Sequence, residues 1–287
     1  MSLGLKTNLS ALNALQNLKN TTSSVNQVFE RLSSGKRVIR AADDAAGLAV
    51  SERLRGDVRT AGVSIRNAND AISVINIADA AIGQISNVLG RLLELAQQSA
   101  NGNNGPDQRS ALQNEYLALT SEIERIAVTT TFNGFRLLSG GDSVTFQVGF
   151  DGSSISEISY SGIHAALADL GLAAAGTSVS TYSLIAATNH ESQSASLLAV
   201  DALKSAVVLL NRNRGILGAT QSRLEAAIQN LGVARDSFQS SESGIVDADA
   251  AEEAAKLARL STLQQAGTAL LAQANLQPRL VLQLLQD

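Results

Sequence analysis

Leu263-Gln264-Gln265-Ala266-Gly267-Thr268-Ala269-Leu270-Leu271-Ala272-Gln273-Ala274-Asn275-Leu276 is the stretch that decides the architecture of this 287-residue chain. Its apolar residues recur at steps of three and four, which predicts one face of a helix. Amides rather than charges cover much of the rest, and the small residues allow another helix to approach closely. Such a helix has too little leucine to form a core alone and too few charges to stand free in water. The apolar pattern continues almost to the last residue, so we expect its partner to be another molecule.

This stretch, with the Pro278 and Val281-Leu282-Gln283-Leu284-Leu285 that follow it, resembles the C-terminal end of bacterial flagellins. Three further segments resemble the same family. Residues 31–49 (RLSSGKRVIRAADDAAGLA) resemble its N-terminal signature, residues 66–73 (RNANDAIS) its first long helix, and residues 217–224 (LGATQSRL) its second. The matching segments span nearly the whole chain, so the resemblance is far more specific than any single motif.

Composition favours long helices and argues against several functions. Aromatic residues make up 3% of the chain and Trp is absent, whereas hydrophobic residues make up 45% and Pro occurs twice, a balance typical of helices packed through aliphatic residues. The net charge of −4 and the lack of a basic block make nucleic acid an unexpected partner. The absence of Cys excludes disulfides and Cys-zinc sites. No apolar run approaches the ~20 residues of a membrane span, and no secretory signal is recognisable.

The N-terminal half predicts two long helices and a third, shorter one. An apolar stripe from Leu5 to Leu32 predicts the first helix, which ends at Ser33-Ser34-Gly35, and Asp43 or Asp44 is suited to cap the next one. From Leu54 to Ala96 the stripe has an average step of 3.5 residues, which is coiled-coil periodicity. Residues 101–106 (NGNNGP) then break the helix and start the third.

In the C-terminal half, leucines recur every seven residues from Leu203 to Leu231, which predicts the second coiled-coil strand. Residues 240–244 are expected to break that helix, and the acids between Asp247 and Glu253 to begin the last one. The predicted intramolecular coiled coil consists of Leu54, Val58, Ile65, Ile72, Ile75, Ile82, Leu89, Leu203, Leu210, Leu217, Leu224 and Leu231.

The predicted fold is mainly α, a long antiparallel coiled-coil bundle formed by the two halves of the chain, with one β-hairpin near 144–160, where apolar and polar residues alternate. Residues 1–34 with 247–287 are expected to form one domain of terminal helices. Residues 35–161 with 190–246 are expected to form the long-helix domain, and 162–189 a short variable connection.

Candidate chemistry is weak. His190-Glu191 begins like the zinc-protease motif HExxH, but Ser194 stands where the second His is needed. With two histidines in the chain, no nucleophile, base and acid can be assembled. We expect no enzyme, no metal and no cofactor.

The family resemblance implies the structural subunit of the flagellar filament, exported through the flagellar type III channel without a cleaved signal and located outside the cell. It also implies a cap protein, hook–filament junction proteins and an export chaperone as partners. Two alternatives are a hook–filament junction protein and, from another class, a cytoplasmic coiled-coil adaptor. A head-to-tail interface that does not close into a ring propagates as a helical filament. The expected self-assembly residues are Leu5, Leu9, Leu12, Leu257, Leu260, Leu263, Ala266, Leu270, Ala274, Val281 and Leu284.

The resemblance also points to an immune-receptor epitope. Many flagellins that a vertebrate toll-like receptor detects carry QRxRELAxQ on the first long helix. Here Arg91 and Glu94 match this pattern, whereas Leu93 replaces the second Arg and Leu119 stands where those relatives have a third. The leucines predict either a lost receptor contact, since Leu cannot form the forked hydrogen bonds of Arg, or a wider packing stripe between helices.

Overall fold

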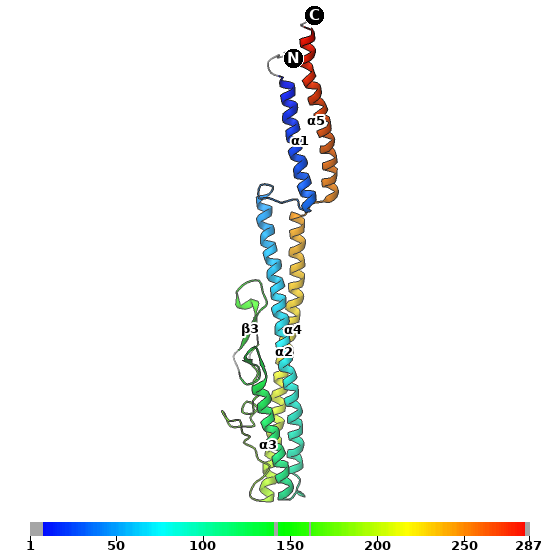
Figure 1. Ribbon diagram of the computed structural model, residues 1–287. Helices are drawn as coiled ribbons and strands as arrows, with labels where there is room; N and C mark the ends of the chain where they lie inside the picture. Colours follow the sequence, from blue (N-terminus) through cyan, green and yellow to red (C-terminus); the bar gives the residue numbers. More distant parts are fainter. Residues whose placement is uncertain (1–7, 141–142, 161, 285–287) are drawn as a thin grey trace. The chain divides into compact units, whose positions relative to one another are not determined.

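The computed structural model describes residues 8–140, 143–160 and 162–284, with side chains described as far as Leu276. The chain divides into two compact units, which Figure 1 draws together. One unit comprises residues 1–58 and 236–287, and the other comprises 59–235. The helices are α1 (Leu9–Ser34), α2 (Ala45–Ser99), α3 (Pro106–Thr129), α4 (Asn189–Val246) and α5 (Ala250–Leu284). The strands are β1 (Thr131–Phe132), β2 (Phe135–Arg136), β3 (Val144–Gln147) and β4 (Glu157–Tyr160). The prediction of a mainly helical fold is confirmed.

Helix boundaries fall where the local chemistry predicts them. The first helix ends at Gly35, which adopts the left-handed conformation (φ 69°) that glycine tolerates best. The Asp44 carboxylate accepts a 2.8 Å hydrogen bond from the Gly47 N–H and so caps α2. Pro106 opens α3, where its missing N–H is harmless. The carboxylate of Asp249 caps α5 by accepting hydrogen bonds from the N–H groups of its first turn.

In the unit formed by residues 59–235, the antiparallel α2 and α4 enclose the core together with α3. The order of their contacts shows the antiparallel direction, since Asp79 pairs with Arg214 and Ser99 with Ser196. The buried core lies on the predicted heptad faces and includes Ile75, Ile82, Leu89, Leu203, Leu210, Leu217 and Leu224. Ile72 is half-buried against it, Ile65 is also half-buried, and Leu231 is buried. Leu54 and Val58, in the other unit, are half-buried.

The predicted hairpin is present as β3 and β4, paired from Val144↔Tyr160 to Gln147↔Glu157. The prediction of a single hairpin is wrong, because β1 and β2 form a second, shorter one. Its two-residue turn consists of Asn133 and Gly134, both with positive φ (49° and 84°). Asn-Gly is the strongest short-range hairpin signal, and here it follows directly after α3.

The segment between β4 and α4 is more than a connection. Six of its side chains are buried in the core, namely Ile163, Ala165, Leu167, Leu170, Leu172 and Leu184. Its backbone forms hydrogen bonds with the rest of the unit; for example, Ala165 N–H donates to Leu138 O (2.8 Å). The hydroxyl of Tyr160, just before the segment, donates to Leu137 O (2.7 Å), and burial raises the pKa of this phenol to about 12. Residues 162–188 therefore close one side of the helical core.

The expected break at residues 240–244 is wrong, since α4 continues to Val246. The Ser241 hydroxyl donates to Ser237 O one turn earlier (2.8 Å), which satisfies it within the helix. The Glu242 carboxylate accepts a 3.0 Å hydrogen bond from Arg55 Nε on α2. The helix ends where Val246 O accepts from the N–H groups of Arg37 and Val38 instead of from a further turn.

The compact units also divide the chain differently from the predicted domains. The ends of α2 and α4, up to Val58 and from Asp236, group with the terminal helices instead of with the long-helix unit. Backbone pairing explains this, because Lys36 and Asp247 form an antiparallel bridge and Ala248 N–H donates to Gly35 O (3.0 Å).

The helices α2 and α4 are long and apolar enough to cross a membrane by length and composition, with mean hydropathy of 1.3 and 1.4 over an 18-residue window. No apolar run in the sequence had predicted such a segment. Core helices of soluble proteins pass the same test, and both helices here carry core side chains. The finding therefore supports no membrane span.

A buried arginine holds the end of the long-helix unit. Arg109 is 2% exposed, and its guanidinium donates to Ser99 O (3.1 Å), Asn101 O (3.3 Å) and Asn189 O (2.8 Å). These carbonyls lie at the end of α2, in the following loop and at the start of α4. A single side chain thus joins three segments, and the negative end of the α2 dipole favours its charge.

We predict that Arg109→Met destabilises the chain by about 2–4 kcal/mol. The carbonyl of the buried Ser99 loses its donor at a cost of about 1–3 kcal/mol, the partly buried carbonyls of Asn101 and Asn189 add less, and the desolvation of Arg offsets part of this loss. Denaturant unfolding would measure the change. Arg125→Met is the matched control, since Arg125 forms an exposed pair with Glu122 on its own helix and should contribute less than about 0.5 kcal/mol. Equal effects of the two variants would contradict the assigned role of Arg109.

Candidate assembly interface

The terminal helices α1 and α5 lie side by side and antiparallel (Figure 1). The Asn8 side chain donates to Ala274 O (2.8 Å), and Gln264 Nε2 donates to the Thr22 hydroxyl (3.2 Å). A Cβ on Gly267 would lie 3.4 Å from Leu18 Cδ1, so the absence of a side chain lets the helices approach. The only buried side chain of α1 is that of Val28, near the base of the pair.

The outer faces of the pair carry exposed leucines. On α1 these are Leu9 (68% exposed), Leu12 and Leu15, and on α5 they are Leu263, Leu270 (63% exposed) and Leu276. Single exposed leucines are ordinary, but contiguous apolar patches mark interaction surfaces.

The predicted self-assembly residues fall into three groups. Leu9, Leu12, Leu263, Ala266 and Leu270 are exposed, whereas Leu257, Leu260 and Ala274 are half-buried in the unit. Leu5, and the side chains of Val281 and Leu284, lie outside the described residues. The prediction missed Leu15 and Leu276 as exposed leucines, of which Leu15 continues the N-terminal stripe and Leu276 lies outside the stripe formed by Leu263 and Leu270.

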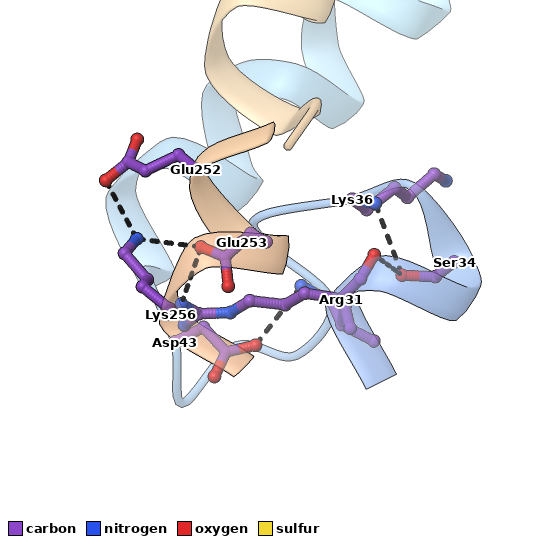
Figure 2. A network of polar contacts seen from close by, with 8 residues as sticks. Arg31, Ser34, Lys36, Asp43, Glu252, Glu253 and Lys256 are labelled. Atoms are coloured by element: carbon purple, nitrogen blue, oxygen red, sulfur yellow. Dashed lines mark hydrogen bonds and ion pairs between the residues drawn. The ribbon is translucent and has the colours of Figure 1, made fainter. Parts of the chain in front are cut away.

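Charged side chains gather at the base of the pair, where Figure 2 shows Arg31 of α1 reaching toward Glu253 of α5. Arg31 Nη1 lies 3.9 Å from Glu253 Oε1, and Lys256 Nζ lies 2.9 Å from the same oxygen. Lys256 also pairs with the exposed Glu252 (2.9 Å). The pKa of Lys256 is raised by its hydrogen bonds to Glu253 and Glu252. The acids predicted to start the last helix thus also pair with cations.

The loop between α1 and α2 is closed by Asp43. Its Oδ2 accepts hydrogen bonds from Arg40 N–H (3.0 Å) and Ile39 N–H (3.2 Å). These backbone bonds, with smaller contributions from Arg31 and Arg40, lower the pKa of the Asp43 carboxyl below its ordinary value of 3.8. The Arg40 side chain in turn pairs with Glu30 of α1 (2.8 Å).

The residues predicted as an immune-receptor epitope lie on α2 in the other unit. The Arg91 guanidinium donates to Glu115 Oε1 of α3 (2.8 and 3.0 Å) and to Glu94 Oε2 (2.9 Å). Leu93 and Leu119 are half-buried and pack against the core. The leucines therefore widen the packing stripe between helices, as one of the two interpretations predicted.

The zinc-protease fragment has a structural role instead. Glu191 and Thr188 cap the start of α4 reciprocally, since Glu191 Oε2 accepts from Thr188 N–H (3.0 Å) and Thr188 Oγ1 accepts from Glu191 N–H (3.3 Å). His190 is exposed. Within the described ranges, no three His, Cys, Asp or Glu side chains are grouped as metal ligands.

Long antiparallel helices with a core of aliphatic side chains, and a pair of terminal helices with exposed leucines, define a class of mainly helical protein. The model of the bacterial flagellin N-terminal helical region matches residues 5–143, and that of the C-terminal helical region matches residues 200–285. This chain belongs to the bacterial flagellin family. It is a structural subunit of the flagellar filament, the extracellular part of the flagellum, and not an enzyme.

Individual relatives agree over nearly the full length. A flagellin of Halalkalibacterium halodurans is 39% identical over 280 residues, covering 97% of this chain and 98% of the relative. A flagellin of Bacillus subtilis is 35% identical over 302 residues, with the same coverage. A flagellar filament 33 kDa core protein of Treponema phagedenis is 36% identical over 288 residues, covering 97% of this chain and 98% of the relative. None of these matches favours a junction protein or a cytoplasmic adaptor.

We predict that the α1–α2 loop loses stability in acid through Asp43. Its folded pKa is lower than its unfolded pKa of about 3.8, so the contribution is present above that pH and is lost as the pH falls through the folded value. Asp43→Asn keeps an acceptor oxygen but does not titrate. Thermal unfolding between about pH 5 and pH 2 should therefore depend less on pH in Asp43→Asn than in the unsubstituted chain. Asp70→Asn, which removes another exposed acid, is the control, and an equal change in both variants would contradict the assignment.

Proposed function

We propose that the exposed leucine face of the α1–α5 pair is the surface through which this chain polymerises. The observation that supports it is the row of leucines on the outer faces of both terminal helices, from Leu9 to Leu15 and from Leu263 to Leu276. A subunit in a filament repeats its contacts with every neighbour, so a shallow apolar face suffices when it is used many times. Burial of apolar surface stabilises by about 25 cal/mol per Å².

The remaining predicted partners belong to the same proposal. A cap protein and hook–filament junction proteins would meet the chain at the two ends of the filament, and an export chaperone would cover the apolar helices before assembly. Export without a cleaved signal through the flagellar type III channel requires an unfolded chain, and the absence of Cys is compatible with this requirement.

We predict that Leu270→Asp abolishes polymerisation while the long-helix unit still folds. An unpaired carboxylate buried between subunits is prohibitive, and even Leu→Ala at a packed site costs about 2–5 kcal/mol. Electron microscopy and sedimentation after addition of salt or filament seeds would show the loss of tubes, and circular dichroism would show retained helicity.

Val179→Asp is the matched control, because Val179 is as exposed (69%) but lies in the segment between β4 and α4. This variant should polymerise normally. Normal filaments from Leu270→Asp would place that side chain in solvent and contradict the proposed interface.

We also propose that the chain is a weak ligand of the vertebrate receptor that detects flagellins. Arg91 is held by Glu115 and Glu94, and Leu93 and Leu119, which stand where detected relatives carry Arg, are packed against the core. A receptor carboxylate or carbonyl that relied on those arginines would stay unpaired, at about 1–3 kcal/mol per site.

A receptor-reporter assay on the purified monomer tests this proposal. We expect lower potency than that of a flagellin with all three arginines, measured at equal monomer concentration. Equal potency would contradict the proposal.

A further inference from the structure

Six glycines lie in the interiors of the two long helices without a neighbour to pack against. A Cβ built at any of them would meet no atom within 4 Å in the part of the chain that the structure describes, apart from the backbone of its own helix. They are Gly62, Gly83 and Gly90 of α2 and Gly215, Gly218 and Gly232 of α4, all in the unit formed by residues 59–235. The absence of a side chain at these positions therefore does not serve the approach of one helix to another within the unit.

Glycine in a helix interior is unfavourable, because it loses more backbone freedom on folding than any other residue. Relative to Ala, each such glycine lowers the equilibrium constant for folding by about two- to fivefold. Since most of these sites lie two or more turns apart, their effects should add approximately. The unit thus has a lower free energy of unfolding than its buried core would allow.

These glycines are confined to the two helices that hold the core together. Most of the buried core side chains belong to α2 and α4, for example Ile82, Leu89 and Leu217. By contrast, α1 and α3 contain no glycine. Glycine weakens the backbone of a helix and leaves the aliphatic faces unchanged, so it lowers stability without altering the packing that defines the fold.

We propose that the six glycines keep the long-helix unit easy to unfold, so that the chain can enter the export channel. A narrow channel admits only an unfolded chain, and the unit with the large buried core is the part that resists unfolding. The use in export rests on the proposed function, whereas the lowered stability does not. The competing interpretation is that a neighbouring copy in the filament fills the space beside these glycines.

Denaturant unfolding of the purified monomer tests the stability directly. Gly83→Ala should raise the equilibrium constant for folding about two- to fivefold, and the combined variant, with Ala at all six positions, should raise it at least about 50-fold. Gly176→Ala is the matched control, because Gly176 has equally empty surroundings but a φ of 80° that disfavours Ala. This control should not raise the folding constant.

Secretion from a flagellated bacterium that lacks its own flagellin tests the use in export. The combined variant should be secreted at least about threefold more slowly than the unsubstituted chain, because unfolding of the unit has to precede entry into the channel. Adding Leu217→Ala, which truncates a buried core side chain, should bring both the folding constant and the rate of secretion back toward those of the unsubstituted chain. Gly176→Ala should not slow secretion.

Two results would overturn the proposal directly, namely an unchanged folding constant in the combined variant, or unchanged secretion of a variant that is measurably more stable. Electron microscopy of the purified combined variant separates the competing interpretation. Normal filaments would support the proposal, whereas loss of filaments with retained helicity would assign the glycines to contact with a neighbouring copy and overturn it. Failure of the unsubstituted chain to be secreted through the flagellar channel would contradict the proposed function and the use in export, and would leave the effect on stability standing.

Discussion

The unit that contains both ends of the chain depends on a short backbone crossing. Arg37 N–H and Val38 N–H donate to Val246 O, Ala248 N–H donates to Gly35 O, and the Arg37 side chain reaches Ile245 O (2.6 Å). Arg37 and Ile245 are 208 positions apart, so closing this loop costs on the order of 5 kcal/mol in chain entropy. The antiparallel path of α2 and α4 brings the two segments close together, so the packing of these helices offsets the loss of chain entropy. Only then are α1 and α5 close enough to pair.

The terminal pair is built differently from the long-helix core. The core has fully buried Ile and Leu on three helices, whereas α1 buries only Val28 and keeps its leucines exposed. A pair of helices with so little internal burial gains limited stability alone, since helices depend mainly on tertiary packing. The exposed leucines of this pair are the feature on which the proposed assembly surface rests.

Polar side chains join helices and loops at several places where aliphatic packing ends. Arg109 holds the turn between α2 and α3 to the start of α4, Asp43 closes the α1–α2 loop, and Glu253 faces Arg31 across the terminal pair. Aliphatic residues recur with a regular period on a helix face, but they can pack against many different apolar surfaces. Hydrogen bonds and ion pairs have direction and fixed partners, so they determine where helices start, stop and align.

The sequence by itself determined the helical class, the heptad faces, the β3–β4 hairpin, the helix end at Gly35 and the acidic stretches in which α2 and α5 begin, because periodicity and local hydrogen bonding depend on near neighbours. The structure decided that Asp44 and Asp249 are the capping residues. Tertiary structure decided the rest. The α4 helix continues through residues 240–244 because Glu242 meets Arg55 and its end is set by Arg37 and Val38. Six side chains of the segment at 162–188 are buried because they cover a side of the core that the long helices leave open. The stripe of α5 could be recognised as apolar, but only its pairing with α1 determined which leucines remain outside, since that choice depends on a partner far away in the sequence.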